Sequence, residues 1–126
     1  MSQEIKILVV DDEPVIRSLF TDLLSEEGYS IETVCNGEEA VNLLKQKTFD
    51  LVFMDVHMPV MNGLEALIQM RQFWPQMTII MMDSFPDQLA IEAQKRGAIT
   101  CIHKPFNIKE ILDLIKKEIK QSGGLK

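Results

Sequence analysis

The sequence predicts an α/β fold in which five β-strands alternate with five α-helices, in the order (βα)5. Two observations support this prediction. Short apolar segments recur along the chain, at Ile5–Val10, Ser30–Cys35, Phe49–Met54, Met77–Met82 and Ile99–His103. The segments that follow them carry apolar residues at helical spacing. Such alternation is typical of a doubly wound parallel sheet whose right-handed crossovers place helices on both faces.

The composition fits one soluble domain. The chain has 126 residues, of which 46% are hydrophobic and 25% are charged, which is enough for one buried core. The net charge of -6 argues against generic binding to nucleic acids, which requires a basic surface. There is neither an apolar run of roughly 18 residues nor a charged-then-apolar leader. A cytoplasmic location is therefore expected, without membrane or direct DNA contact.

Three of the apolar segments are almost unbroken, and each of them runs into carboxylates. The first is followed by Asp11 and Asp12, the third by Asp55, and the fourth by Asp83. Nearly continuous apolar residues predict strands that are covered on both faces, as in a parallel sheet.

The first two helices are indicated by an apolar stripe and by capping residues. The stripe of the first helix consists of Val15, Ile16, Leu19, Phe20, Leu23 and Leu24. Pro14 suits the first turn of this helix, and Gly28 lies where it ends. Asn36 can cap the second helix, and Glu38 and Glu39 favour its first turn because they lie at the positive end of the helix dipole.

The remaining helices are expected around Gly63–Phe73, around Asp87–Arg96 and in the last segment. Trp74-Pro75 ends the third helix, because the residue before a proline avoids the helical region. Pro86 favours a start of the fourth helix just after it, and Gly97 stops that helix. The apolar stripe of the fifth helix consists of Ile108, Ile111, Leu112, Ile115 and Ile119.

Carboxylates are expected to gather at one edge of this sheet. A common strand order for five such units is 2-1-3-4-5, with the functional crevice at the carboxyl ends of strands 1 and 3. Asp11 and Asp12 end the first of these strands and Asp55 ends the other. Neighbouring carboxylates repel by about 1 kcal/mol at 4 Å in water and by about four times as much near a protein surface. A cation or a shared proton is therefore needed, and oxygen ligands favour Mg²⁺.

Lys104 follows the fifth strand and adds an ammonium group at the same edge. A divalent metal, a lysine and an aspartate nucleophile together can handle a phosphoryl group. The alternative is that these acids only form turns or cap helices, which is the common role of a single Asp at a strand end. That alternative requires four independent placements at the crevice to coincide by chance.

The motifs "ILVVDDEP", "DLVFMDVHMPVMNG" and "CIHKPF" resemble the receiver domain of two-component response regulators, over residues 4–121. The resemblance implies a flavodoxin-like fold, with a stand-alone receiver domain at 1–121 and a flexible tail at 122–126. It implies a phosphorelay protein that takes a phosphoryl group from a sensor histidine kinase or phosphotransfer protein. The output would be contact between a downstream protein target and the surface around helices 4 and 5. No enzymatic activity is implied beyond self-phosphorylation and autodephosphorylation.

The resemblance also implies a role for each site residue. Asp55 would accept the phosphoryl group as an aspartyl phosphate, and Lys104 would contact the phosphoryl oxygens. Asp12, Asp55 and the backbone carbonyl of His57 would ligate Mg²⁺. Asp11 would act on the metal largely through water.

Two positions depart from the pattern of the family. In receivers the fourth strand normally ends on Thr or Ser, whose hydroxyl reports phosphorylation, and an aromatic residue lies three positions before the lysine. Those positions carry Asp83 and Cys101 here. Asp83 could repel the phosphoryl group, could be protonated and donate a hydrogen bond because crowded acids have raised pKa values, or could pair with Lys104. A shift by one residue would instead give Ser84 the hydroxyl role.

The sequence bears on three other function classes. A phosphatase of the haloacid dehalogenase type requires Asp-x-Asp spacing, whereas the acids are adjacent here. A nucleotide- or flavin-binding module requires a glycine-rich loop after the first strand, and "VVDDEPVIRS" has no glycine. A phosphorylation-independent interaction module with a receiver-like fold stays open, because Asp83 and Cys101 alter the switch and a fold does not establish its chemistry.

The histidines and cysteines have simpler interpretations. His57 either influences water at the mouth of the site or, as the more ordinary alternative, is an exposed loop residue that contributes only its carbonyl. His103 is interpreted as a strand-end residue. Cys35 and Cys101 belong to opposite edge strands, too far apart for the Cα separation of about 5.5–6 Å that a disulfide needs.

Overall fold

The computed structural model describes residues 4–83, 87–98, 100–104 and 107–121. Strands and helices alternate throughout this part of the chain, as the sequence predicts. The strands are β1 (Lys6–Val10), β2 (Ser30–Val34), β3 (Leu51–Asp55), β4 (Ile79–Asp83) and β5 (Thr100–His103). The helices are α1 (Pro14–Glu26), α2 (Gly37–Leu44), α3 (Gly63–Phe73), α4 (Gln88–Lys95) and α5 (Ile108–Gln121). Ser84, Pro86 and the expected tail at 122–126 lie outside the described residues.

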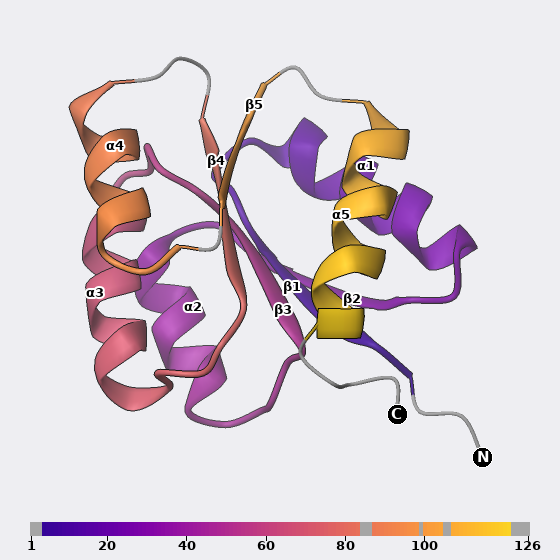
Figure 1. Cartoon of the computed structure of the whole chain (residues 1–126), viewed down its shortest axis with the longest axis horizontal. Coiled ribbons are helices and arrows are strands. Elements are labelled where there is room, and N and C mark those ends of the chain that lie inside the picture. The colour runs from indigo at the N-terminus through magenta and orange to yellow at the C-terminus, as the bar shows by residue number, and fades with distance from the viewer. Residues whose placement is uncertain (1–3, 84–86, 99, 105–106, 122–126) are drawn as a thin grey trace.

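All strand pairs are parallel and the strand order is β2-β1-β3-β4-β5. This confirms the predicted order 2-1-3-4-5. Figure 1 shows α2, α3 and α4 on one side of the sheet and α1 and α5 on the other. The chain therefore reverses its winding between β1 and β3, which places the carboxyl ends of these two strands beside each other.

Two apolar clusters hold the layers together, one on each face of the sheet. On β3, Val52 and Met54 pack in the cluster that α2, α3 and α4 cover. Leu51 and Phe53 pack in the cluster that α1 and α5 cover. Side chains of a strand point alternately to its two faces, so an unbroken apolar strand feeds both clusters. This confirms that the apolar runs are strands buried on both faces.

Capping residues set where the helices begin. Asn36 accepts a hydrogen bond from the Glu39 backbone N–H and so caps α2, as predicted. Asn62 and Glu65 form a reciprocal capping box at the start of α3. A β-carbon on Gly63 would lie 2.3 Å from the Asp55 carbonyl oxygen. Glycine is therefore needed for α3 to begin directly against the end of β3.

The apolar stripe of α1 is buried only in part. Phe20 and Leu24 are buried, whereas Val15 is 76% exposed and Leu19 is 40% exposed. The stripe is wider than the face that α1 presents to the sheet, because each residue advances about 100° around the helix axis.

Within the described residues, no helix has both the length and the apolar character that crossing a membrane demands.

Candidate functional site

Three carboxylates form an acid cluster at the carboxyl edge of the sheet. Asp11 follows β1, and Asp55 is the last residue of β3; both are buried, whereas the neighbouring Asp12 is exposed. β1 and β3 are adjacent strands, so their ends meet. Carboxylate oxygens of Asp11, Asp12 and Asp55 lie within 4.8 Å of one another. The structure thus brings together the three acids that the sequence assigns to one site.

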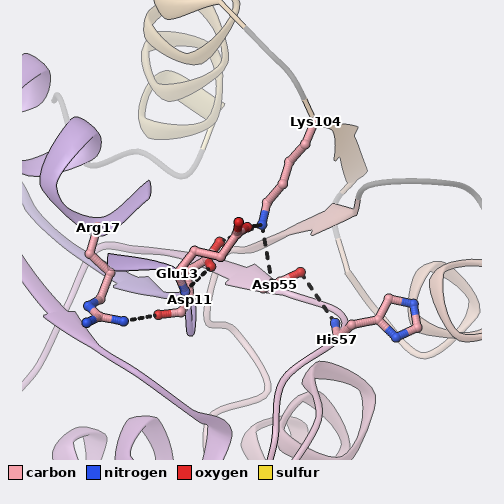
Figure 2. Close-up of polar contacts among 6 residues, drawn as sticks. All are labelled: Asp11, Glu13, Arg17, Asp55, His57 and Lys104. Atoms are coloured by element: carbon pink, nitrogen blue, oxygen red, sulfur yellow. Dashed lines mark hydrogen bonds and ion pairs between the residues drawn. The ribbon is translucent and has the colours of Figure 1, made fainter. Parts of the chain in front are cut away.

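Lys104 reaches into this acid cluster from the end of β5, as Figure 2 shows. Its Nζ lies 2.9 Å from Asp11 Oδ2, 2.9 Å from Glu13 Oε1 and 3.4 Å from Asp55 Oδ2. Burial disfavours the charge on Lys104, but hydrogen bonds with Asp11 and Glu13 outweigh it, so its pKa lies above the ordinary value. The ammonium is therefore permanently charged at neutral pH.

Asp55 is a buried carboxyl group with an altered pKa. Burial, together with the charge of Asp11, raises the pKa of Asp55 to about 6, against the lowering effect of Lys104. Burial also raises the pKa of Asp11. At neutral pH Asp55 is still mostly ionised, and it is more basic than an ordinary aspartate. A basic carboxylate is suited to act as a nucleophile.

Backbone and side-chain donors orient the two buried acids. The Glu13 backbone N–H donates to Asp11 Oδ1 at 2.9 Å, and Arg17 Nη1 donates to the Asp11 carbonyl at 2.7 Å. The His57 backbone N–H donates to Asp55 Oδ1 at 3.3 Å. Sequence reasoning missed Glu13 and Arg17. The available signal was that Glu13 follows the acid pair directly and Arg17 lies one helical turn after it.

The ring of His57 points away from the acid cluster (Figure 2). Its Nε2 lies 2.7 Å from Asp87 Oδ2. Asp87 in turn caps α4, because its Oδ1 accepts a hydrogen bond from the Ala90 backbone N–H. The loop after β3 is thus connected to the start of α4. The ring is directed toward α4 rather than toward the acid cluster.

Asp83 lies at the end of β4 and its partners are on β5. The side chain is fully buried, with the Cys101 thiol donating to Oδ2 at 3.1 Å and His103 Nδ1 lying 2.5 Å from Oδ1. Burial raises the pKa of the Cys101 thiol to about 12, and Asp83 adds to the rise. Sequence reasoning placed His103 at a strand end, which is right, but missed its contact with Asp83.

The alternative in which Asp83 pairs with Lys104 is wrong. The Lys104 ammonium contacts other carboxylates, and only its backbone N–H reaches Asp83, donating to the carbonyl oxygen at 2.6 Å. Alternation along β4 explains this, since it directs the Asp83 side chain toward the face covered by α2, α3 and α4. The alternative in which Ser84 supplies a hydroxyl falls outside the described residues, and the alternatives in which Asp83 repels the phosphoryl group or is protonated stay predictions.

Cys35 and Cys101 are both free thiols. Cys101 lies on β5, and Cys35 directly follows β2, at the opposite edge of the sheet. The predicted absence of a disulfide between them agrees with this separation.

The sequence and the structure are both similar to known proteins of one family. Residues 7–116 match the family described as "Response regulator receiver domain". The chain is 35% identical to Sporulation initiation phosphotransferase F of Bacillus subtilis, over 89% of this chain and 91% of that protein. It is 34% identical to Chemotaxis protein CheY of Thermotoga maritima, over 89% of this chain and 95% of that protein. A CheY-like receiver domain protein from Methanospirillum hungatei has a similar structure, with a TM-score of 0.92 and 26% identity, covering 98% of this chain and 100% of that one.

Proposed function

The chain belongs to the family of response regulator receiver domains, and we propose that Asp55 is the residue on which it accepts a phosphoryl group. One observation carries the proposal. Asp55 is a buried carboxylate of the acid cluster that lies 3.4 Å from the Lys104 ammonium, as Asp11 also does at 2.9 Å, and burial raises the pKa of Asp55 to about 6. A nucleophile, metal ligands and a fixed positive charge are the groups that phosphoryl transfer requires.

The transfer step follows from these positions. An Asp55 oxygen attacks the phosphorus of a phosphohistidine on a sensor histidine kinase or phosphotransfer protein. The new P–O bond forms as the P–N bond breaks, and the electron pair of that bond stays on the imidazole nitrogen. Lys104 then shifts from the carboxylates to the phosphoryl oxygens and offsets their charge. The raised pKa of Asp55 supports this role, because the group stays ionised yet basic at neutral pH.

The acid cluster also fits Mg²⁺. Asp11, Asp12 and Asp55, with the backbone carbonyl of His57, would hold the ion, and these are the hard oxygen ligands that Mg²⁺ prefers. Bound Mg²⁺ would neutralise charge on the phosphoryl oxygens. Among the described residues, the ammonium of Lys104 forms ion pairs with Asp11 and Asp55, two of the three carboxylates. An additional cation would reduce their mutual repulsion.

The partners that we propose are proteins. The acidic net charge of -6 supports a protein target rather than DNA. Phosphorylation would shift the population toward a state that presents a surface around α4 and α5 to that target. The proposal covers a receiver domain at residues 1–121, located in the cytoplasm and without catalysis beyond the phosphorylation and dephosphorylation of Asp55.

The proposal is tested with Mg²⁺ and acetyl phosphate as a small phosphodonor. Intact mass is recorded over time for the wild type and for Asp55→Asn. We expect the wild type to gain one phosphoryl group and the variant to gain none. An equal gain in Asp55→Asn would place the phosphate elsewhere and would refute the assignment of Asp55.

Asp83 favours a second candidate, a phosphorylation-independent interaction module with the receiver fold. A buried carboxylate replaces the hydroxyl that usually responds to the phosphoryl group, and it already has two partners on β5. Absence of any phosphoryl gain in a folded wild type, with several donors and pH values, would support this second candidate.

A further inference from the structure

A second polar cluster lies at the carboxyl edge of the sheet and joins β4 to β5. It consists of Asp83, Cys101 and His103, and is called the β4–β5 cluster below. Both carboxylate oxygens of the fully buried Asp83 have a partner, His103 Nδ1 at 2.5 Å and the Cys101 thiol at 3.1 Å. The strand register permits this, because Asp83 lies opposite His103. A buried carboxylate is stable only with such partners.

The β4–β5 cluster is directed away from the acid cluster. Met81 and Cys101 pack on the face of the sheet that α2, α3 and α4 cover, and Asp83, two residues after Met81, points to the same face. Phe53 packs on the opposite face, which Asp55, two residues later, therefore shares. Among the described residues, Asp83 does not belong to the group of carboxylates that could hold a metal together.

Asp83 is nevertheless close to the proposed phosphoacceptor along the sheet edge. Asp55 lies opposite Met82, the residue before Asp83. The Lys104 backbone N–H donates to the Asp83 carbonyl at 2.6 Å. A carboxylate released from β5 at this position would add negative charge beside the incoming phosphoryl group and would compete for the Lys104 ammonium.

The pleat of β4 directs the first atoms of the Asp83 side chain away from Asp55, and we infer that His103 and Cys101 are positioning residues that keep its carboxylate turned toward β5, so that it does not rotate across the sheet edge into the phosphoryl site. The inference rests on the proposed role of Asp55 as phosphoacceptor. It explains how the protein can carry the Asp83 carboxylate so close to the place where a phosphoryl group would be transferred to Asp55. In the tautomer that carries its proton on Nδ1, His103 carries most of the effect, because an imidazole N–H is a stronger donor than a thiol.

The test measures the rate of Asp55 phosphorylation by acetyl phosphate with Mg²⁺, in two variants of His103. Leu removes the donor, whereas Asn keeps an N–H close to the position of Nδ1. We expect His103→Leu to react about tenfold more slowly, equivalent to about 1.4 kcal/mol, and His103→Asn to react at nearly the wild-type rate. The His103 side chain is 62% exposed, so His103→Leu should fold; His103→Ala replaces it if thermal unfolding shows otherwise.

Asp83→Asn separates positioning from a general structural role. Without the carboxylate there is no charge to hold away, so the double variant with His103→Leu should react as fast as Asp83→Asn alone. A purely structural contribution of His103 would slow both backgrounds equally. That result, or a wild-type rate in the single His103→Leu variant, would overturn the inference.

The outcome for the wild type distinguishes this inference from the proposed function. If the wild type gains no phosphoryl group but Asp83→Asn does, and adding Asp55→Asn abolishes that gain, then Asp55 is the acceptor and Asp83 blocks it despite its partners, which overturns the inference alone. If neither protein gains a phosphoryl group, the proposed function fails and the inference fails with it.

Discussion

Lys104 lies closer to Asp11 than to Asp55, with Nζ–Oδ2 distances of 2.9 Å and 3.4 Å. Its further contact, with Glu13 at 2.9 Å, involves a carboxylate side chain that is 57% exposed. Exposed ion pairs contribute little and are easily exchanged. The contact with Glu13 is therefore weak, and its loss costs little when the Lys104 ammonium moves toward a phosphoryl group on Asp55.

Replacement of Lys104 should slow phosphorylation of Asp55. We expect Lys104→Met to lower the rate with acetyl phosphate by about a hundredfold, the loss typical of a preorganised charge that faces a developing anion. Lys109→Met is the matched control, because Lys109 is exposed and pairs only with Asp113 among the contacts of the described residues. An equal loss in both variants would contradict a specific role for Lys104.

The stability of the protein should depend on pH through Asp55. Its pKa is raised from 3.8 to about 6 in the folded protein, so the folded state binds the proton more tightly than the unfolded state. The contribution of Asp55 to the free energy of unfolding is therefore highest below pH 4 and falls as pH rises through 6. The total fall is about 3 kcal/mol, from about 1.4 kcal/mol per pKa unit.

Urea unfolding at pH 4, 5, 6 and 7 without Mg²⁺ measures this effect. As pH rises, the free energy of unfolding of the wild type should fall relative to that of Asp55→Asn. A difference that stays constant over this range would show that Asp55 titrates normally in the folded protein.

Mg²⁺ should stabilise the protein through the acid cluster. A ligand that binds only the folded state adds about 2.7 kcal/mol at a concentration of 100 times its Kd. We expect the Tm of the wild type to rise with Mg²⁺ and that of Asp12→Asn to rise much less. Asp22→Asn is the control, since Asp22 is exposed on α1 and outside the acid cluster. Equal shifts in all three proteins would indicate non-specific binding.

Arg71 should stabilise the packing of α3 against α4. Its guanidinium donates to the Gly97 carbonyl through Nη2 at 2.6 Å and to the Met77 carbonyl through Nη1 at 2.5 Å. Arg71→Met should lower the free energy of unfolding by about 2 kcal/mol, because these hydrogen bonds involve a charged donor.

Arg96→Met is the matched control for this change. Arg96 forms an exposed i,i+4 pair with Glu92, and losing such a pair should cost about 0.5 kcal/mol or less. Both values are measured by urea unfolding. A similar small cost for Arg71→Met would mean that the carbonyl contacts do not stabilise the helix pair.

Much of the fold was predictable from local patterns. The unbroken apolar segments around Val52 and Ile80 predicted strands buried on both faces, because only a strand covered by helices on both sides can bury every side chain. The chain order of strands and helices then left few topologies, and the switch point placed Asp11 beside Asp55. The acid cluster was therefore determined by the sequence.

The partners of each side chain were decided only by the tertiary structure. Register sets Asp83 opposite His103, and pleat alternation turns its carboxylate to the face opposite to that of Asp55. No local pattern contains this information, because it depends on how β4 and β5 align across a long connection. The same holds for Glu13, whose contact with Lys104 joins residues 91 positions apart. The sequence alone thus determined which groups meet at the edge of the sheet, and the packing of strands and loops decided which of them pair.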